Sequence, residues 1–248
     1  MFILQVISVD GSFLKGKFRG CLLFATAQDA DHHIYPVGFA MVDGENDGSW
    51  GFFFRQMLRV VEDTTDLVWV SDRHMSILKG IRDSYIFAKH GICTYHLFQN
   101  VRFRFKCGGL QDEFMTMCKA YTYDEFQVLY AEFCARVPGA GQYLKEVGFS
   151  NWARAFYTGN RYNITTTNNS ECLNSVFKYP KDLPLTALVD VILETVGTWF
   201  VKHRKASGQE GKVVSDWVGN AIRANFVQSL SMGVRQLSAY EYEVRKVL

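Results

Sequence analysis

Hydrophobic and polar positions alternate in short runs over the first part of the chain. Three apolar runs, VISVD at 6–10, GCLLFATAQD at 20–29 and IYPVGFAMVD at 34–43, are separated by turns that contain Gly or Asp. Strands joined by such short turns pair with their neighbours in antiparallel fashion. The pattern therefore predicts an antiparallel meander of three strands.

Helix and strand signals then follow in alternation. The segment 49–63 carries apolar residues at helical spacing and begins with Ser49, a suitable N-cap. LVWVSD at 67–72 predicts a fourth strand, 76–90 a second helix, and GICTYH at 91–96 a fifth strand. We therefore predict an α/β core in which helices pack on a five-stranded sheet.

The chain changes character after this core. Residues 97–160 are rich in Phe and Tyr with few strand signals, which predicts a helical insertion between core segments 1–96 and 161–206. Within the second core segment, apolar residues of 185–200 share one helical face and are followed by the basic run KHRK, typical of a helix C-terminus. This helix should pack on the sheet.

The last part, 207–248, is expected to be a helical extension. The Gly- and Ser-containing segment 206–212 sets it off from the core.

Composition narrows the class of protein. Hydrophobic residues make up 48% of the 248 residues, enough for a sizeable core, and no apolar run approaches the roughly 20 residues of a membrane span. The six cysteines form no CxxC pair, so we expect reduced thiols and no structural zinc. Because 27 Lys and Arg nearly balance 25 Asp and Glu, contact with nucleic acid would depend on local patches. We expect an intracellular protein with no membrane partner and no signal peptide.

Three carboxylates are candidates for a metal site. Asp10 and Asp72 each end an apolar strand run, and Glu171 lies in the polar segment TTTNNSECLN. Neighbouring strands can place two acids at one edge of a sheet, where a divalent cation would relieve their repulsion. The alternative is that both aspartates end strands in ordinary turns, since Asp-Gly and Ser-Asp are common turn pairs. Glu45 is a rival third acid, but its acidic surroundings favour a solvated turn.

Longer stretches resemble a known family. They are SVDGSFLKGKFRGCLLFATAQDADHHIYPVGFAMVDGENDGSW around Asp10, VSDRHMSI around Asp72, CTYHLFQN, and GNRYNITTTNNSECLNSVFK around Glu171. Together these stretches resemble the Mutator-like element transposases of plants, which belong to the DDE transposases. The resemblance runs from about residue 7 to about 205, with the stretches in the family's order.

The resemblance implies a fold and a site. The fold is an RNase H-like mixed five-stranded sheet flanked by helices, with an all-helical insertion before the last catalytic helix. Asp10, Asp72 and Glu171 would be the catalytic triad and would bind two Mg²⁺ or Mn²⁺ ions. Cys93 and His96 match the family's C(2)H signature, and we place them near the site rather than in a zinc site.

Further residues are candidates for the surroundings of the site and for DNA contact. His74, two positions after Asp72, is expected near the site, although an exposed loop histidine is the simpler interpretation. Basic residues near aromatic ones could contact phosphates, although such charges usually lie on a solvated face. The candidate DNA-binding residues are Lys15, Lys17, Arg19, Arg102, Arg104 and Arg161.

The leading hypothesis is a transposase catalytic domain that cleaves and transfers DNA strands at transposon ends in the nucleus. Its partners would be double-stranded DNA of the transposon ends and of the target, and a homo-oligomer is left open. The alternatives are a domesticated or inactive transposase-derived protein that binds DNA or regulates transcription, and a plain RNase H-like nuclease. Family members also carry an N-terminal DNA-binding region and often a C-terminal zinc finger. Neither is recognised in this sequence, so we expect a fragment or a decayed genomic copy, truncated before any zinc finger.

Overall fold

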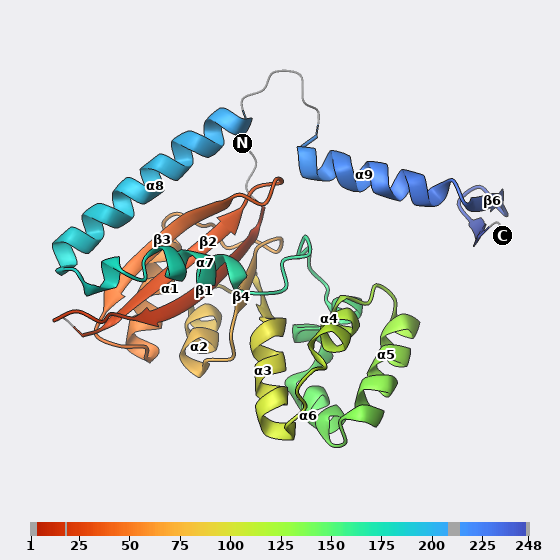
Figure 1. Cartoon of the computed structure of the whole chain (residues 1–248), viewed down its shortest axis with the longest axis horizontal. Coiled ribbons are helices and arrows are strands. Elements are labelled where there is room, and N and C mark those ends of the chain that lie inside the picture. The colour runs from red at the N-terminus through yellow and green to blue at the C-terminus, as the bar shows by residue number, and fades with distance from the viewer. Residues whose placement is uncertain (1–3, 18, 208–213, 247–248) are drawn as a thin grey trace.

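A mixed five-stranded sheet forms the centre of the fold, with the strand order β3-β2-β1-β4-β5. The computed structural model describes residues 4–17, 19–207 and 214–246, and Figure 1 shows the arrangement of its elements. The strands are β1 (Val6–Phe13), β2 (Cys21–Gln28), β3 (Ile34–Val42), β4 (Val68–Ser71) and β5 (Lys89–Ile92).

Strand pairing confirms the predicted meander. β1 pairs with β2, and β2 with β3, in antiparallel fashion, whereas β4 is parallel to both β1 and β5. The first strand is longer than predicted: it does not end at Asp10 but continues to Phe13, which pairs with Cys21. Asp10 therefore lies within β1, opposite Phe24 of β2.

Two layers of helices cover the sheet. Helices α1 (Asp47–Met57) and α2 (Met75–Ser84) pack on one face, and α7 (Asn168–Val176) and α8 (Leu185–Ser207) on the other. The side chains of strand β2 alternate between the two faces: Leu23 joins the cluster with α1 and α2, whereas Leu22 and Phe24 join the cluster with α7 and α8. The prediction that the helix at 185–200 packs on the sheet is confirmed.

Helices α3 to α6 form a separate lobe, below the sheet in Figure 1. They span α3 (Thr94–Phe105), α4 (Gln111–Lys119), α5 (Tyr123–Arg136) and α6 (Ala140–Val147), and are followed by the short 3₁₀ helices η1 (Phe149–Asn151) and η2 (Arg154–Phe156). The lobe has its own core, with Phe114, Phe126 and Trp152 fully buried. Arg73 of the sheet domain connects to it, because its Nη1 donates a 2.6 Å hydrogen bond to the hydroxyl of Tyr143.

Two local predictions are wrong. The segment 91–96 is not a strand throughout, because β5 ends at Ile92 and α3 begins at Thr94, with Cys93 at the N-cap position. The helix expected to start at Ser49 is α1, whose N-cap is Asn46: the Asn46 side chain accepts a 3.0 Å hydrogen bond from the Ser49 amide.

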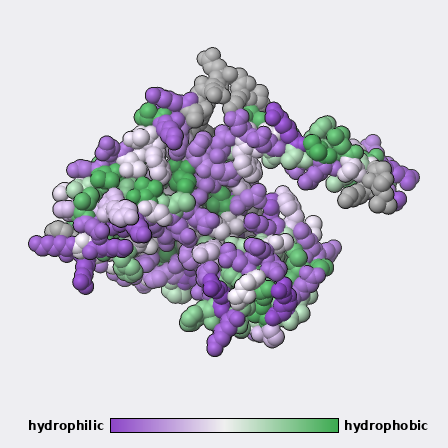
Figure 2. Space-filling view, viewed as in Figure 1, coloured by the Kyte–Doolittle hydropathy of each residue, from purple (hydrophilic) through white to green (hydrophobic). Residues whose placement is uncertain are grey.

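The C-terminal part is helical only in its first half. It contains α9 (Asp216–Ser229) and then an antiparallel hairpin of β6 (Met232–Gln236) and β7 (Tyr242–Lys246). Most of the segment 206–212, expected to set this part off, lies outside the described residues. The arm formed by α9, β6 and β7 extends away from the sheet in Figure 1, and Figure 2 shows apolar residues on its surface.

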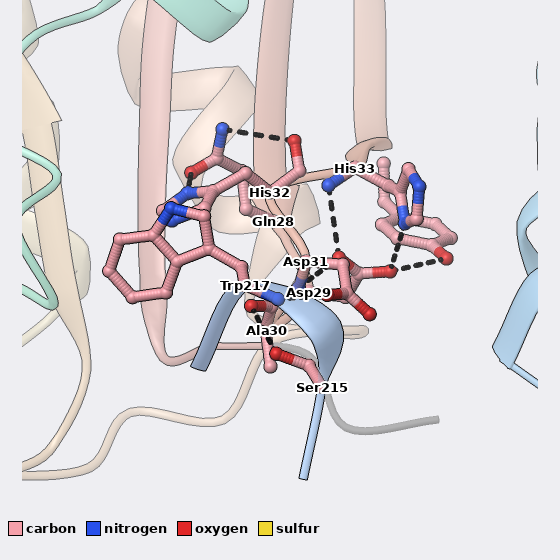
Figure 3. Close-up of polar contacts among 9 residues, drawn as sticks. Gln28, Asp29, Ala30, Asp31, His32, His33, Ser215 and Trp217 are labelled. Atoms are coloured by element: carbon pink, nitrogen blue, oxygen red, sulfur yellow. Dashed lines mark hydrogen bonds and ion pairs between the residues drawn. The ribbon is translucent and has the colours of Figure 1, made fainter. Parts of the chain in front are cut away.

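The start of α9 is anchored on the turn between β2 and β3 (Figure 3). The Ser215 hydroxyl donates a 2.9 Å hydrogen bond to the carbonyl of Ala30, and the amide of Trp217 donates one of 3.1 Å to Asp31. The Trp217 ring meets the His32 ring edge-on, with centroids 4.5 Å apart. No helix within the described part of the chain is both long and apolar enough to cross a membrane.

Candidate active site

The parallel pair β1 and β4 brings two of the candidate acids to the same edge of the sheet. The register pairs Ser8 with Val70, and each acid comes two residues later: Asp10 in β1 and Asp72 directly after β4. Both side chains therefore leave the same face of the sheet. The charge of Asp72 acts on the Asp10 carboxyl, which agrees with this placement.

Glu171 reaches the same face from α7. The helix is fixed on the sheet by Ser170, whose hydroxyl donates a 3.1 Å hydrogen bond to the carbonyl of Ser8 and lies 3.0 Å from the hydroxyl of Thr26. Glu171 follows directly in the first turn of α7, half-buried, and its charge also acts on Asp10. The structure thus brings together the three acids predicted from the sequence.

One turn further along α7, Asn174 contacts Asp10 directly. Its amide Nδ2 donates a 2.7 Å hydrogen bond to Asp10 Oδ2. The amide oxygen of Asn174 accepts hydrogen bonds from the Ser12 hydroxyl at 2.7 Å and from Lys181 Nζ at 3.2 Å. Because the oxygen is held by two donors, the amide nitrogen faces the carboxylate and contacts its Oδ2.

The site makes the charged form of Asp10 costly. Burial, together with the nearby charges of Asp72 and Glu171, raises the pKa of Asp10 to about 7, although the positive charge of His96 partly offsets this rise. Such crowding of carboxylates is relieved by a cation placed among them. The electrostatics of the site therefore favour binding of a positive charge.

Cys93 and His96, the pair singled out in the sequence, border the site at the start of α3. A hydrogen bond with Cys93 and the charges of Cys93, Glu171 and Asp72 raise the pKa of His96 to about 9, against the effect of burial. His96 Nε2 lies 3.7 Å from Glu171 Oε1. Burial alone would raise the pKa of the Cys93 thiol, but hydrogen bonds from His96 and Thr167 outweigh it and lower that pKa.

Thr167 joins these groups to the start of α7. Its hydroxyl lies 3.2 Å from Glu171 Oε1, 3.4 Å from the Cys93 sulfur and 3.3 Å from His96 Nδ1, and its single proton can be donated to one of them at a time. Its backbone N–H also donates to the Cys93 sulfur at 3.3 Å. Cys93 is therefore engaged in positioning contacts rather than facing solvent.

Asp72 is oriented by the turn that starts α2. One of its carboxylate oxygens, Oδ1, accepts a 2.9 Å hydrogen bond from the backbone amide of His74. His74 is half-buried at the N-cap position of α2, and its ring Nδ1 is buried without a hydrogen-bond partner. His74 thus contacts Asp72 through its backbone amide.

The donor set suits a hard divalent cation, because all three acids offer carboxylate oxygens. Among the residues that the structure describes, no three His, Cys, Asp or Glu side chains already surround one metal position. Binding of an ion would therefore require the side chains of Asp10, Asp72 and Glu171 to turn towards each other. Glu45, the rival third acid, accepts a 3.2 Å hydrogen bond from the Trp50 indole.

The candidate DNA-binding residues fall into two groups. Exposed residues lie in the turn between β1 and β2 and on α3; they are Lys15, Lys17, Arg19, Arg102 and Arg104. Arg161 differs, because it is buried and its Nη2 donates a 3.2 Å hydrogen bond to the carbonyl of Ile92.

Sequence reasoning missed Asn174, Thr167 and Lys181. Asn174 lies three positions after Glu171, so both share a helical face, and this spacing could have indicated it. Lys181 is buried beyond the end of α7, and its contact with Asn174 depends on how the chain folds back. No local pattern marks it.

Comparisons with known proteins agree in part with the resemblance. Residues 6–100, which include Asp10 and Asp72, match the family model described as MULE transposase domain. This match supports a Mutator-like transposase family and a transposase-related function for that part of the chain; Glu171 lies outside the matched range.

Other comparisons add little. No curated protein matches the chain. A cryo-EM structure of a simian T-cell lymphotropic virus intasome in complex with PP2A regulatory subunit B56 gamma aligns with 61% of this chain and 50% of that chain, at 7% identity and a TM-score of 0.28. The chain thus spans half of that protein, and a likeness this weak carries no argument.

Proposed function

We propose that this chain is the catalytic part of a Mutator-like DNA transposase, which cleaves DNA at transposon ends and joins the freed strand to a target. The observation that carries the proposal is the convergence of Asp10, Asp72 and Glu171 on one face of the sheet. The family match over residues 6–100 supports it independently. The strand order and the mixed pairing support an RNase H-like fold.

Asp10, Asp72 and Glu171 would hold two Mg²⁺ or Mn²⁺ ions. When bound, such ions activate the attacking water or hydroxyl and stabilise the leaving oxygen of a phosphodiester. The residues of the chain supply the frame: Asn174 orients Asp10, and Thr167 orients Glu171. Such outer contacts keep a ligand in place and tune its affinity.

His96 adds a positive charge beside the acids. With its pKa raised to about 9, the ring is protonated at neutral pH. An imidazolium beside the acids would attract a DNA phosphate while leaving the carboxylates to the metal ions. The exposed basic residues of the β1–β2 turn and of α3 would contact the duplex, and the nucleus would be the place of action.

The test is an assay of supercoiled plasmid and labelled duplex DNA with the purified chain in Mg²⁺ or Mn²⁺. The proposal expects metal-dependent nicking and joined strand-transfer products, both lost in Asp72→Asn. The matched control is Asp83→Asn, which makes the same change at an exposed position of α2.

Other outcomes point to other functions. Nicking without joined products would favour a plain nuclease. Salt-sensitive DNA binding without any nicking, in a folded protein, would contradict the proposed chemistry and favour a DNA-binding derivative of a transposase.

A further inference from the structure

A cavity of about 410 Å³ lies where the helical lobe meets the loop that leads to α7. It is lined from α4 by Lys119, from η2 by Arg154, and from the loop by Arg161 and Thr165. The residues that line it include three cations and no Asp or Glu. The cavity is therefore electropositive, and it is separate from the three carboxylates of the candidate active site.

Arg161 supplies a buried charge to the wall of this cavity. The residue is 7% exposed, and its guanidinium packs so closely on Gly91 that a Cβ there would clash with it. Nη2 donates to the carbonyl of Ile92, and the Tyr157 ring lies 4.6 Å from the guanidinium carbon. Nε and Nη1, however, are buried without any hydrogen-bond partner.

This charge has no carboxylate partner in the described part of the chain. No carboxylate there forms an ion pair with Arg161. The titratable groups coupled to it are Cys93, Tyr157 and Cys118, and burial raises the pKa of Tyr157 to about 12 and that of Cys118 above its ordinary value, so these two are neutral at pH 7. Arginine stays protonated in proteins, and a buried cation without a partner is costly. A structural role in holding β5 explains one nitrogen of the guanidinium but leaves the other two unexplained.

The mouth of the cavity combines further cations with exposed aromatic rings. Lys119 is exposed at the end of α4, and the guanidinium carbon of Arg154 lies 3.7 Å from the centre of the Tyr121 ring. Tyr121 and Tyr162 are exposed, at 72% and 45%. Phosphate-binding cations beside exposed aromatic rings are typical of sites for single-stranded nucleic acid, where the rings stack on bases.

We propose that this cavity binds a phosphate group of a single-stranded segment of DNA, with Lys119, Arg154 and the buried Arg161 supplying the positive charge. The loop that leads to α7 borders both this cavity and the candidate active site. This position favours a phosphate of a DNA strand over the phosphate of a free nucleotide. Thr165, in the wall of the cavity, accepts hydrogen bonds from Thr94 next to Cys93, and Thr167 contacts Glu171. The inference rests on the proposed function for the identity of the strand, but phosphate binding itself needs neither metal nor cleavage.

The experiment measures binding of a fluorescein-labelled oligothymidylate by fluorescence anisotropy in EDTA over a range of salt concentrations. The test variant carries Lys119→Gln and Arg154→Gln. The control variant carries Arg136→Gln and Lys145→Gln, the same loss of charge at exposed positions of α5 and α6. The test variant should bind at least about tenfold more weakly than wild type. The slope of log affinity against log salt concentration should become shallower by about one or more, as expected when at least one phosphate contact is lost. The control should stay within about twofold.

Arg161→Gln is a second test of the buried charge. Where circular dichroism shows that it folds, its affinity should fall at least as far as that of the test variant; where it does not fold, the variant at Lys119 and Arg154 decides. Thymidine monophosphate and inorganic phosphate serve as competitors. Binding of thymidine monophosphate without binding of the oligothymidylate would overturn the strand as the source while keeping the phosphate site.

Equal affinity and equal salt dependence of the test and control variants, without competition by phosphate, would overturn the proposal. Because EDTA removes divalent metal ions, this measurement reports phosphate binding without cleavage. Loss of the proposed phosphate site is therefore distinguishable from loss of the proposed cleavage activity.

Discussion

Asn174 Nδ2 donates a 2.7 Å hydrogen bond to Asp10 Oδ2 and so ties α7, which carries Glu171, to the strand that carries Asp10. The contact involves a residue that lies outside the family match. The contact makes Asn174 a positioning residue, whose removal should act through Asp10.

Asn174→Ala should lower the Mn²⁺-dependent nicking rate about tenfold, because loss of an outer contact typically weakens a metal ligand by that order. Titration of the rate with Mn²⁺ should show that a higher concentration is needed for half-maximal activity. Ser175→Ala, at the adjacent exposed position, is the control. Equal Mn²⁺ titrations for Asn174→Ala and wild type would contradict the positioning role.

Helix α7 depends on an aromatic stack for its place on the sheet. The rings of Phe177 and Phe24 are stacked with centroids 5.4 Å apart, and both side chains are fully buried. Phe177→Ala should lower the free energy of unfolding by about 4 kcal/mol, through lost burial and the cavity left behind. Urea unfolding would measure this.

The control for this change is Phe103→Ala, which removes a ring that is 89% exposed on α3. Its effect should stay within about 0.5 kcal/mol. Similar losses of stability for the two variants would show that α7 is not held by the Phe24 stack.

Stability should depend on pH through Asp29, at the end of β2. Burial alone would raise the pKa of this carboxyl, but hydrogen bonds from His33, from Tyr35 and from backbone amides outweigh it and hold the pKa below its ordinary value. The stabilisation is therefore present above the pKa of the unfolded chain and is lost as the pH falls through the lower folded pKa.

Asp29→Asn should accordingly destabilise the protein by about 2 kcal/mol at neutral pH, and this difference from wild type should shrink as the pH falls below about 4. Urea unfolding of both proteins across this pH range is the measurement, with Asp43→Asn as the exposed control. A difference that is the same at all pH values would argue against a stabilising charge at Asp29.

The arm at the C-terminus should loosen when its anchor is removed. Ser215 caps α9 by accepting a 3.2 Å hydrogen bond from the Val218 amide, and its hydroxyl also contacts Ala30. Ser215→Ala should weaken α9 by about 1 kcal/mol, seen as faster hydrogen exchange of the α9 amides. Ser229→Ala, at the other end of α9, should raise the exchange rate of these amides less than Ser215→Ala does. A larger effect of Ser229→Ala would show that Ser215 is not the anchor.

The sequence was sufficient to predict the sheet and the convergence of its acids. Short apolar runs that end in turns indicate strands, and acids at corresponding positions of parallel neighbours lie at the same edge of the sheet. The extent of β1 could not be predicted in the same way, because Asp10 and Gly11 form a common turn pair. Pairing of Phe13 with Cys21 overrides that local signal.

Features that depend on tertiary contacts could not be predicted from the sequence alone. Thr94 was assigned to a strand because GICTYH continues the β-branched pattern, but its amide donates to the carbonyl of Thr165, and α3 begins there. The expected helical extension is wrong in its second half, where Val234 pairs with Val244 in the terminal hairpin. The buried charge of Arg161 has no signature in its neighbours along the chain.

The central claim is that three carboxylates act as one metal site. The most direct measurement is the rate of plasmid nicking in Mn²⁺ by four variants: Asp10→Asn, Asp72→Asn, Glu171→Gln and the double variant of Asp10 and Glu171. Glu132→Gln, at an exposed position of α5, is the control. Each single change should lower the rate at least about a hundredfold, and the double variant should be no slower than the worse single one, because residues that act as a unit lose activity together. A nicking rate of Glu171→Gln equal to that of wild type would contradict the shared site. So would a double variant whose loss of rate equals the product of the two single losses.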